Sequence, residues 1–174
     1  MDWHTLTQQF GPSPRGLVIN VDITQQHLSL HDASHCIKTW PVSTAKNGAG
    51  NQQDSFQTPT GTHCIAEKIG DGDPACSLFV GRQNTGQIAT IINDAVAADK
   101  DMISSRILWL QGLQAGINKG GDVDSHDRYI YIHGTPEEGL IGTPASHGCI
   151  RMRNADVIEL FDLVDSGTLV HIQP

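Results

Sequence analysis

Several features that mark particular protein classes are missing from this sequence of 174 residues. It has no cluster of lysine and arginine, and its 19 acidic residues against 11 basic ones give a formal net charge of -8. This balance argues against nucleic acid and anionic membrane surfaces as partners. No stretch reaches the roughly 18 apolar residues that a membrane-spanning helix needs, so we expect no membrane partner.

Two further signals are absent. The start, Met1–Thr5, has neither the basic residues nor the apolar stretch of roughly 7–15 residues found in secretory signals, so we expect a cytoplasmic protein. The four cysteines are Cys36, Cys64, Cys76 and Cys149, and no two form a Cys-x-x-Cys pair. A structural zinc site is therefore not expected. In a chain without a secretory signal, reduced thiols are favoured over two disulfides.

The composition predicts a single globular domain over residues 1–174. Hydrophobic residues make up 38% of the chain and charged residues 17%, which is typical of a packed core and not of disorder. A chain of this length can bury such a core. No internal repeat or low-complexity tract divides it.

Short apolar runs between turn-forming residues predict many strands. These runs are 17–23, 27–30, 36–42, 62–66, 77–80, 88–92, 106–110, 128–133 and 168–172. The first two flank a short polar break and predict a hairpin. A short helix is an alternative to the strand at 106–110. Residues 95–100 fit either a helical turn or a lid.

One helix is predicted near the C-terminus. Asn154 suits an N-cap position, and four apolar residues then repeat at i, i+3, i+4 and i+7 on one face. These are Val157, Leu160, Phe161 and Val164. Ser166-Gly167 predicts the end of the helix. The expected fold class is mainly β, a barrel or sandwich-like mixed sheet with one late helix.

The segment with the most chemical information is His133-Gly134-Thr135 followed by Ser146-His147-Gly148-Cys149-Ile150-Arg151-Met152. A thiol is a useful nucleophile only as a thiolate, so it needs a nearby base or cation. His133 ends a predicted strand and can face Cys149 once the intervening loop folds back. His147 is only two residues from the cysteine, which suits shaping the turn better than acting as a base.

The residues around the cysteine also suit acyl transfer. Gly148 allows a close approach of backbone to substrate. Backbone N–H groups at Gly148 and Cys149 can stabilise an oxyanion, an effect worth about 3–4 kcal/mol per donor elsewhere. Arg151 is a cation suited to a carboxylate, and Arg153 and Arg128 are further candidates.

Two alternatives compete with a catalytic role for Cys149. An inert buried cysteine is the common case and is favoured for Cys36, Cys64 and Cys76. It is disfavoured for Cys149, whose polar neighbours are poor core material. Zinc binding by His133, His147 and Cys149 is chemically possible but lacks a fourth ligand or a catalytic glutamate at motif spacing. We therefore expect no metal and no cofactor.

The pattern from His133 to Thr135 and from Ser146 to Met152 resembles the signature of the L,D-transpeptidase (YkuD-type) catalytic domain. The resemblance extends over nearly the whole chain. Residues 17–44 are similar to the opening strands of that family, and 58–62 to the loop before its central strands. Residues 154–157 and 167–172 are similar to its closing helix and strand.

The resemblance implies a sandwich-like mixed sheet with a cleft over the cysteine motif. It implies that Cys149 is the nucleophile, that His133 is the general base, and that the Gly134 carbonyl orients His133. By the same resemblance Ser146, His147 and Gly148 shape the pocket and oxyanion hole, and Arg151 contacts substrate. The implied reaction cleaves the bond before a terminal D-amino acid in peptidoglycan stem peptides.

Three functions compete at this point. The first is a cytoplasmic L,D-carboxypeptidase that removes D-Ala from muropeptide or free stem peptides in cell-wall recycling. The second is a periplasmic L,D-transpeptidase, in which an amine replaces water as acceptor. The third is a non-catalytic muropeptide sensor, which is disfavoured because a pure binder needs neither Cys149 nor His133. The oligomeric state is not predicted.

The first prediction concerns the nucleophile. Cys149→Ala should abolish turnover of a stem tetrapeptide, because the attacking thiolate is lost. Cys36→Ala, Cys64→Ala and Cys76→Ala serve as controls and should retain most activity when products are measured by mass spectrometry. Turnover that survives in Cys149→Ala would end the mechanism.

Overall fold

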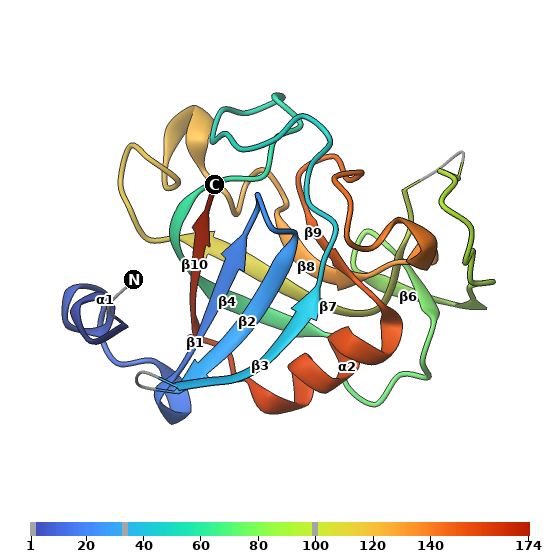
Figure 1. Ribbon diagram of the computed structural model, residues 1–174, viewed down its shortest axis with the longest axis horizontal. Helices are drawn as coiled ribbons and strands as arrows, with labels where there is room; N and C mark the ends of the chain where they lie inside the picture. Colours follow the sequence, from blue (N-terminus) through green and yellow to red (C-terminus); the bar gives the residue numbers. More distant parts are fainter. Residues whose placement is uncertain (1–2, 33–34, 99–100) are drawn as a thin grey trace.

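The computed structural model describes residues 3–32, 35–98 and 101–174 (Figure 1). These residues form a mainly β fold with ten strands in one mixed sheet and two α-helices. The helices are α1 (Trp3–Phe10) and α2 (Asn154–Leu163). The strands are β1 (Leu17–Asp22), β2 (His27–Asp32), β3 (His35–Pro41), β4 (Gly61–Ile69), β5 (Ser77–Val80), β6 (Gln83–Ile88), β7 (Ile103–Gly112), β8 (Tyr131–Gly134), β9 (Ile150–Met152) and β10 (Leu169–Gln173).

The sheet runs in the order β3-β2-β1-β10-β4-β7-β5-β6, and β8 joins it by pairing with β7 on one side and β9 on the other. Two of the pairs are parallel, β1 with β10 and β8 with β9. Strands β1 and β10 come from opposite ends of the chain, and a long loop separates β8 from β9. The predicted mixed sheet is confirmed, and β1 and β2 form the predicted hairpin.

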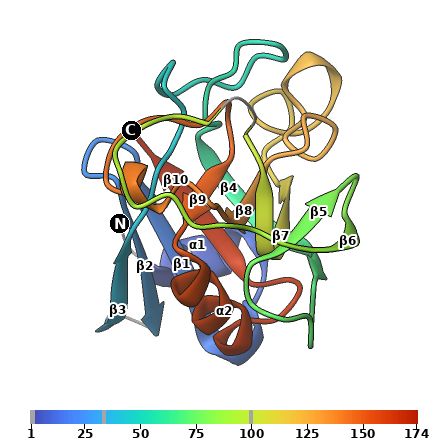
Figure 2. The ribbon, with the colours of Figure 1, turned by 90° about the vertical axis from the view of Figure 1, so that its right-hand side faces the viewer.

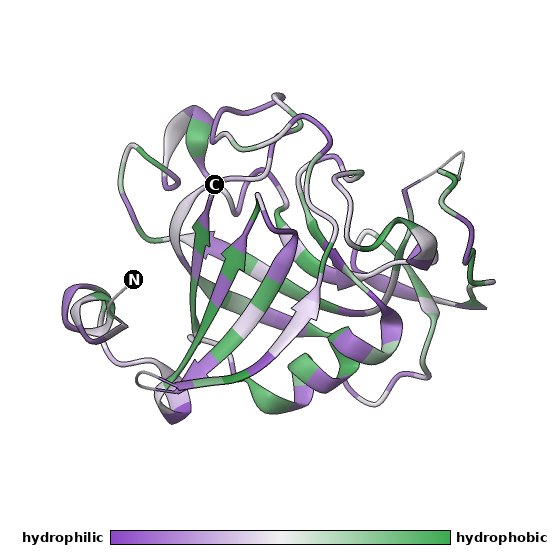
Figure 3. Cartoon of the chain, viewed as in Figure 1, coloured by the Kyte–Doolittle hydropathy of each residue, from purple (hydrophilic) through white to green (hydrophobic). Residues whose placement is uncertain are grey.

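The main core lies between α2 and the sheet (Figures 1 and 2). All four apolar residues of the predicted helix face are buried in it. Figure 3 shows apolar and polar bands alternating along the strands, as expected where only one face of a strand is buried. Among the described residues, neither helix is long and apolar enough to span a membrane.

The helix prediction needs three corrections. The N-cap position is Arg153, not Asn154, and α2 ends at Leu163, before Ser166. Helix α1 was not predicted, because it is short and depends on tertiary contacts. Trp3 and Leu6 pack against Val18 and Leu169 in a second, smaller cluster.

Asn154 has a different role from capping. Its side chain is buried, and its Oδ1 accepts hydrogen bonds from the hydroxyls of Ser104 and Ser105, each at 2.6 Å. Its Nδ2 donates to the Thr135 carbonyl at 3.0 Å and to Glu138 at 2.7 Å. The start of α2 is therefore tied to β7 and to the loop that leaves β8.

Two strand predictions also need correction. The strand predicted at 88–92 is β6 at 83–88. Residues 128 and 129 belong to a turn and 130 follows it, so that β8 begins at Tyr131. Residues 95–98 form no helix, and 99–100 lie outside the described part of the chain. The segment before them packs on the loop after β8, since the Ile92 N–H donates to the Pro136 carbonyl and the Ile92 carbonyl accepts from the Gly139 N–H (Figure 2).

A buried histidine lies on β4. The side chain of His63 is fully buried, with Nδ1 at 3.1 Å from the Gly61 carbonyl and Nε2 at 2.9 Å from the Ser125 hydroxyl. A neutral ring satisfies both contacts, because Nδ1–H donates and Nε2 accepts. Burial lowers the pKa of His63 from 6.5 to about 4.

This burial predicts a pH dependence of stability. The unfolded chain binds the proton more tightly than the folded one, so stability is complete above about pH 6.5 and falls as the pH drops towards 4. The loss should approach about 3 kcal/mol. His63→Gln should flatten the urea-unfolding profile between pH 6.5 and 4, whereas the exposed control His27→Gln should not. Parallel profiles for wild type and His63→Gln would contradict this account.

Candidate active site

The parallel pair β8–β9 brings the two ends of the predicted motif together. Ile132 pairs with Ile150, His133 with Arg151 and Gly134 with Met152. Cys149 directly precedes β9 and therefore lies beside Tyr131, two residues from His133 along β8. Residues on one strand separated by two positions share a face, so His133 and Tyr131 point the same way.

The thiol of Cys149 lies among backbone groups. Tyr131 N–H donates to Sγ at 3.4 Å, and Sγ donates to the Tyr129 carbonyl at 3.4 Å. Desolvation raises the pKa of the Cys149 thiol to about 12, although the Tyr131 N–H opposes the shift. The free site therefore holds a thiol, and a base must remove its proton when substrate binds.

The residue predicted to be that base is His133. Its ring is buried, and Nδ1–H donates to the Gly134 carbonyl at 2.7 Å. That hydrogen bond, expected for Gly134, leaves Nε2 as the proton acceptor. Burial lowers the pKa of His133, while the charge of Asp101 opposes this shift. Burial thus favours a neutral imidazole at His133 and a neutral thiol at Cys149.

The turn before Cys149 is held from both sides. Ser146 Oγ donates to the Cys149 carbonyl at 2.6 Å, and Gly148 N–H donates to Ser146 Oγ at 3.3 Å. Gly148 has a φ of 133°, and an added Cβ would lie 3.3 Å from Ile130 and 3.4 Å from the Gln57 carbonyl. A glycine is thus required there. Because Gly148 N–H already has an acceptor, its predicted part in an oxyanion hole stays a prediction.

Arg151 is buried among charged and polar partners. Its side chain is 1% exposed, and its guanidinium pairs with Glu137, with Asp101 at 3.2 Å and with Ser43 Oγ at 3.3 Å. The predicted contact of Arg151 with substrate remains untested. Arg128, another candidate, donates to the Asn51 and Gln57 carbonyls at 2.8 and 2.7 Å.

Asp101 was missed by sequence reasoning. Its carboxylate bridges Arg151 and His147, with Oδ2 at 3.2 Å from His147 Nδ1. The charges of His133 and Arg151 help to lower the pKa of Asp101, although desolvation acts against them. A single aspartate close to the ambiguous segment 95–100 offered no pattern by which to find it.

An aromatic cluster against which Cys149 packs was also missed by sequence reasoning. The Trp109 ring stacks on His126 with centroids 3.9 Å apart, and it meets the rings of Tyr129 and Tyr131. The guanidinium of Arg82 lies over Trp109 at 4.5 Å. Cys149 packs against this cluster.

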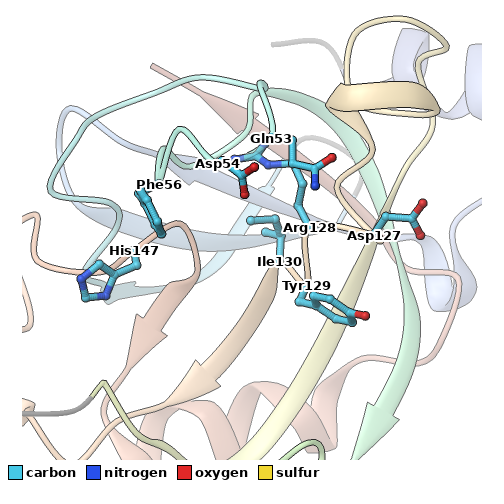
Figure 4. Close-up of a pocket in the computed structure, with 8 residues that line it drawn as sticks. All are labelled: Gln53, Asp54, Phe56, Asp127, Arg128, Tyr129, Ile130 and His147. Carbon is cyan, nitrogen blue, oxygen red and sulfur yellow. The ribbon is translucent and has the colours of Figure 1, made fainter.

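A pocket of about 230 Å³ opens next to the cysteine turn (Figure 4). Figure 4 shows Phe56 and His147 on one side, with Arg128, Ile130 and Tyr129 on the other. Phe56 and Tyr129 are both more than half exposed and both have positive φ values. Within residues 3–32, 35–98 and 101–174, no group of three or more histidine, cysteine or acidic side chains could hold a metal.

Known proteins match this chain over different lengths. The sequence model of the L,D-transpeptidase catalytic domain (YkuD) matches residues 16–172. A YkuD protein of Bacillus licheniformis, named as an L,D-transpeptidase, is 54% identical over 43 residues, which is 25% of this chain and 26% of that protein. YbiS of Escherichia coli, also named as an L,D-transpeptidase, is 49% identical over 43 residues, which is 25% of this chain and 14% of that protein.

Solved structures match over more of the fold. An L,D-transpeptidase from Mycobacterium smegmatis has a TM-score of 0.54 at 19% identity, over 91% of this chain and 59% of that one. L,D-transpeptidase 3 from Mycobacterium tuberculosis, in complex with a faropenem-derived adduct, has a TM-score of 0.55 at 18% identity. The match covers 91% of this chain and 60% of that one. These similarities establish the fold, and the chain spans only part of each relative.

The geometry predicts how His133 contributes. His133→Ala should slow acylation of Cys149 by about 100- to 10,000-fold, the usual range for general base catalysis, when thioester formation is followed by mass spectrometry. The exposed control His27→Ala should leave the rate unchanged. Alkylation rates of Cys149 that are the same in wild type and His133→Ala from about pH 5 to 9 would contradict this role.

Proposed function

Because the chain belongs to the family of L,D-transpeptidase catalytic domains, we propose that it is a cysteine acyl-transfer enzyme for peptidoglycan stem peptides, acting as an L,D-carboxypeptidase. It removes the terminal D-Ala from tetrapeptide stems. The observation that carries the proposal is the parallel pairing of β8 with β9, which sets His133 opposite Arg151, two residues beyond Cys149. The Gly134 carbonyl holds the Nδ1–H of His133 and leaves Nε2 as acceptor.

The reaction proceeds in two halves. Nε2 of His133 takes the thiol proton while Sγ of Cys149 attacks the carbonyl carbon of the L-centre at stem position 3. The C–N bond to D-Ala breaks, the amine takes the proton from His133, and a thioester remains. Water then gives a proton to His133 and attacks the thioester, which releases the tripeptide acid and restores the thiol.

The neutral resting state supports this route. Both the thiol and the imidazole are buried enough for desolvation to favour their uncharged forms. A proton transfer coupled to attack needs no preformed ion pair, and it keeps the nucleophile protonated until a substrate excludes water from the cleft. Tyr131 N–H, already at Sγ, is placed to remain near the developing charge.

The alternative is L,D-transpeptidation, in which an amine in place of water attacks the thioester. The pocket beside the cysteine turn favours it, since Asp54 and Asp127 line it and attract an ammonium group. Arg128, which also lines it, has donors engaged by backbone carbonyls. Hydrolysis is placed first because water needs no binding surface of its own.

The cellular setting is part of the proposal. The four cysteines are free thiols, and Cys36 is exposed. Unpaired exposed thiols suit a reducing compartment, which supports a cytoplasmic enzyme that processes soluble muropeptides during cell-wall recycling. Cell fractionation with an antibody to the protein tests this part, and recovery from the periplasm would overturn it.

The product ratio separates the two activities. A disaccharide tetrapeptide incubated with wild type should give the tripeptide and D-Ala by mass spectrometry, and Cys149→Ala should give neither. Addition of an excess of a D-amino acid should leave the tripeptide as the main product. If exchanged tetrapeptide or crosslinked dimer forms faster than tripeptide, the transpeptidase alternative replaces the carboxypeptidase.

A further inference from the structure

Arg82 lies at the tip of the β5–β6 hairpin. Val80 pairs with Gln83, so Gly81 and Arg82 form a two-residue turn, and both have positive φ, at 55° and 66°. A turn of this kind is best made by glycine or asparagine, because left-handed backbone is unfavourable for a residue with a Cβ. Turn formation alone therefore does not account for an arginine at this position.

The aromatic cluster holds the guanidinium of Arg82 in place. Its central carbon lies 4.5 Å from the ring centroid of Trp109 and 5.5 Å from that of Tyr129. Its Nη1 donates to the Tyr131 hydroxyl at 3.2 Å. Stacking on aromatic faces restrains the plane of the guanidinium while leaving its N–H edges available.

Tyr131 connects this cation to the nucleophile. Its backbone N–H touches Cys149 Sγ, and its hydroxyl accepts the hydrogen bond from Arg82. A tyrosine side chain spans about 7 Å, the length of two residues of extended peptide. A carboxylate on a residue next to the scissile bond is thus within reach of Arg82 while the carbonyl lies at Sγ.

Two other arginines near the site already have partners. Arg151 pairs with Glu137 and Asp101, and Arg128 donates to carbonyls of the 50–57 loop. In the part of the chain that the structure describes, no ion pair involves Arg82. Its hydrogen bond to Tyr131 raises its pKa, so it stays charged.

We propose that Arg82 is the specificity-determining residue that binds a carboxylate of the substrate peptide, through paired N–H donors one tyrosine side chain away from Cys149. The inference rests on the proposed function and names the group by which that site recognises its substrate. A planar guanidinium matches a carboxylate with two parallel hydrogen bonds. The net charge of -8 repels anions at long range, so recognition of an anionic peptide depends on such a local cation.

Two carboxylates of a stem peptide share this chemistry. One is the C-terminal carboxylate of the leaving D-residue, and the other is a side-chain carboxylate of the residue whose carbonyl is attacked. Three peptides distinguish them: the tetrapeptide acid, its C-terminal amide, and the acid with the residue 3 side-chain carboxylate amidated. The carboxylate whose amidation removes the effect of Arg82 is the one bound.

The experiment measures kcat and KM for wild type, Arg82→Ala, Arg82→Lys and Arg15→Ala on the three peptides. Arg82→Ala should raise KM for the acid by about 10- to 100-fold, the usual effect of losing a charge-assisted hydrogen bond, with kcat changed less. It should change KM by under about 2-fold for the one amidated peptide that lacks the bound carboxylate. Arg82→Lys, which keeps the charge but loses the fork, should fall between wild type and Arg82→Ala.

Arg15→Ala is the matched control. Arg15 pairs with Asp165 on the surface, so this variant loses the same charge away from the aromatic cluster and should behave as wild type. If Arg82→Ala raises KM equally on the acid and the amidated peptides, Arg82 only supports the aromatic cluster, and the inference is overturned. So does unchanged KM on the acid.

Two further readouts keep the result decisive. If Arg82→Ala melts at a much lower temperature than wild type, Arg82→Lys and Tyr131→Phe serve as the test variants. Tyr131→Phe keeps the backbone N–H at Sγ and removes the hydrogen bond from the guanidinium to the hydroxyl. A KM for Arg82→Lys equal to that of wild type on all peptides then overturns the inference. Inactivity of wild type on every peptide would instead overturn the proposed function itself.

Discussion

The parallel pairing of β8 with β9 determines the distance between two residues that lie sixteen positions apart in the chain, His133 and Cys149. A parallel pair needs a crossover between its strands, and here the crossover is the loop 135–149. The loop is pinned along its length. Ala45 bridges to Ser146, Ser43 bridges to Arg151, and the buried guanidinium of Arg151 pairs with Glu137.

Burial sets the electrostatics of the site that this pairing builds. Removing water raises the pKa of the Cys149 thiol and lowers that of the His133 imidazole, so both changes oppose a resting thiolate–imidazolium pair. Neighbouring charges only modify this balance. Asp101 favours protonated His133 and disfavours ionised Cys149, whereas Arg151 acts in the opposite sense on both.

Two kinds of cation therefore surround the nucleophile. Arg151 is internal, and its charge is neutralised by Glu137 and Asp101, so its main effect is to hold the loop and β9 in place. Arg82 is external, stacked on Trp109 and without a carboxylate partner among the described residues. The two arginines differ in their neighbours and not in residue type. Sequence reasoning favoured Arg151 as the substrate contact because it lies close to Cys149 in the chain.

Much of the fold followed from local patterns. The hairpin of β1 and β2, the strands at β3, β4, β5, β7 and β10, and the apolar face of α2 all depend on alternation or helical spacing, which is visible in the sequence. Helix α1 was missed because Trp3 and Leu6 are stabilised by partners more than ten residues away. The strand at 128–130 was wrong because Tyr129 adopts a left-handed backbone, with φ at 56°.

The amino-acid sequence by itself determined the chemical groups: one cysteine in a Ser-His-Gly-Cys-Ile-Arg segment and one histidine at the end of a strand. Their side-chain types and their order suit nucleophilic attack by a thiol that a nearby base activates. Only the tertiary structure decided which groups surround them. Asp101, Arg82 and Trp109 come from separate strands and loops, and no spacing rule connects them to Cys149. Contacts between distant segments arise from sheet pairing and packing, which the sequence encodes only through the whole chain.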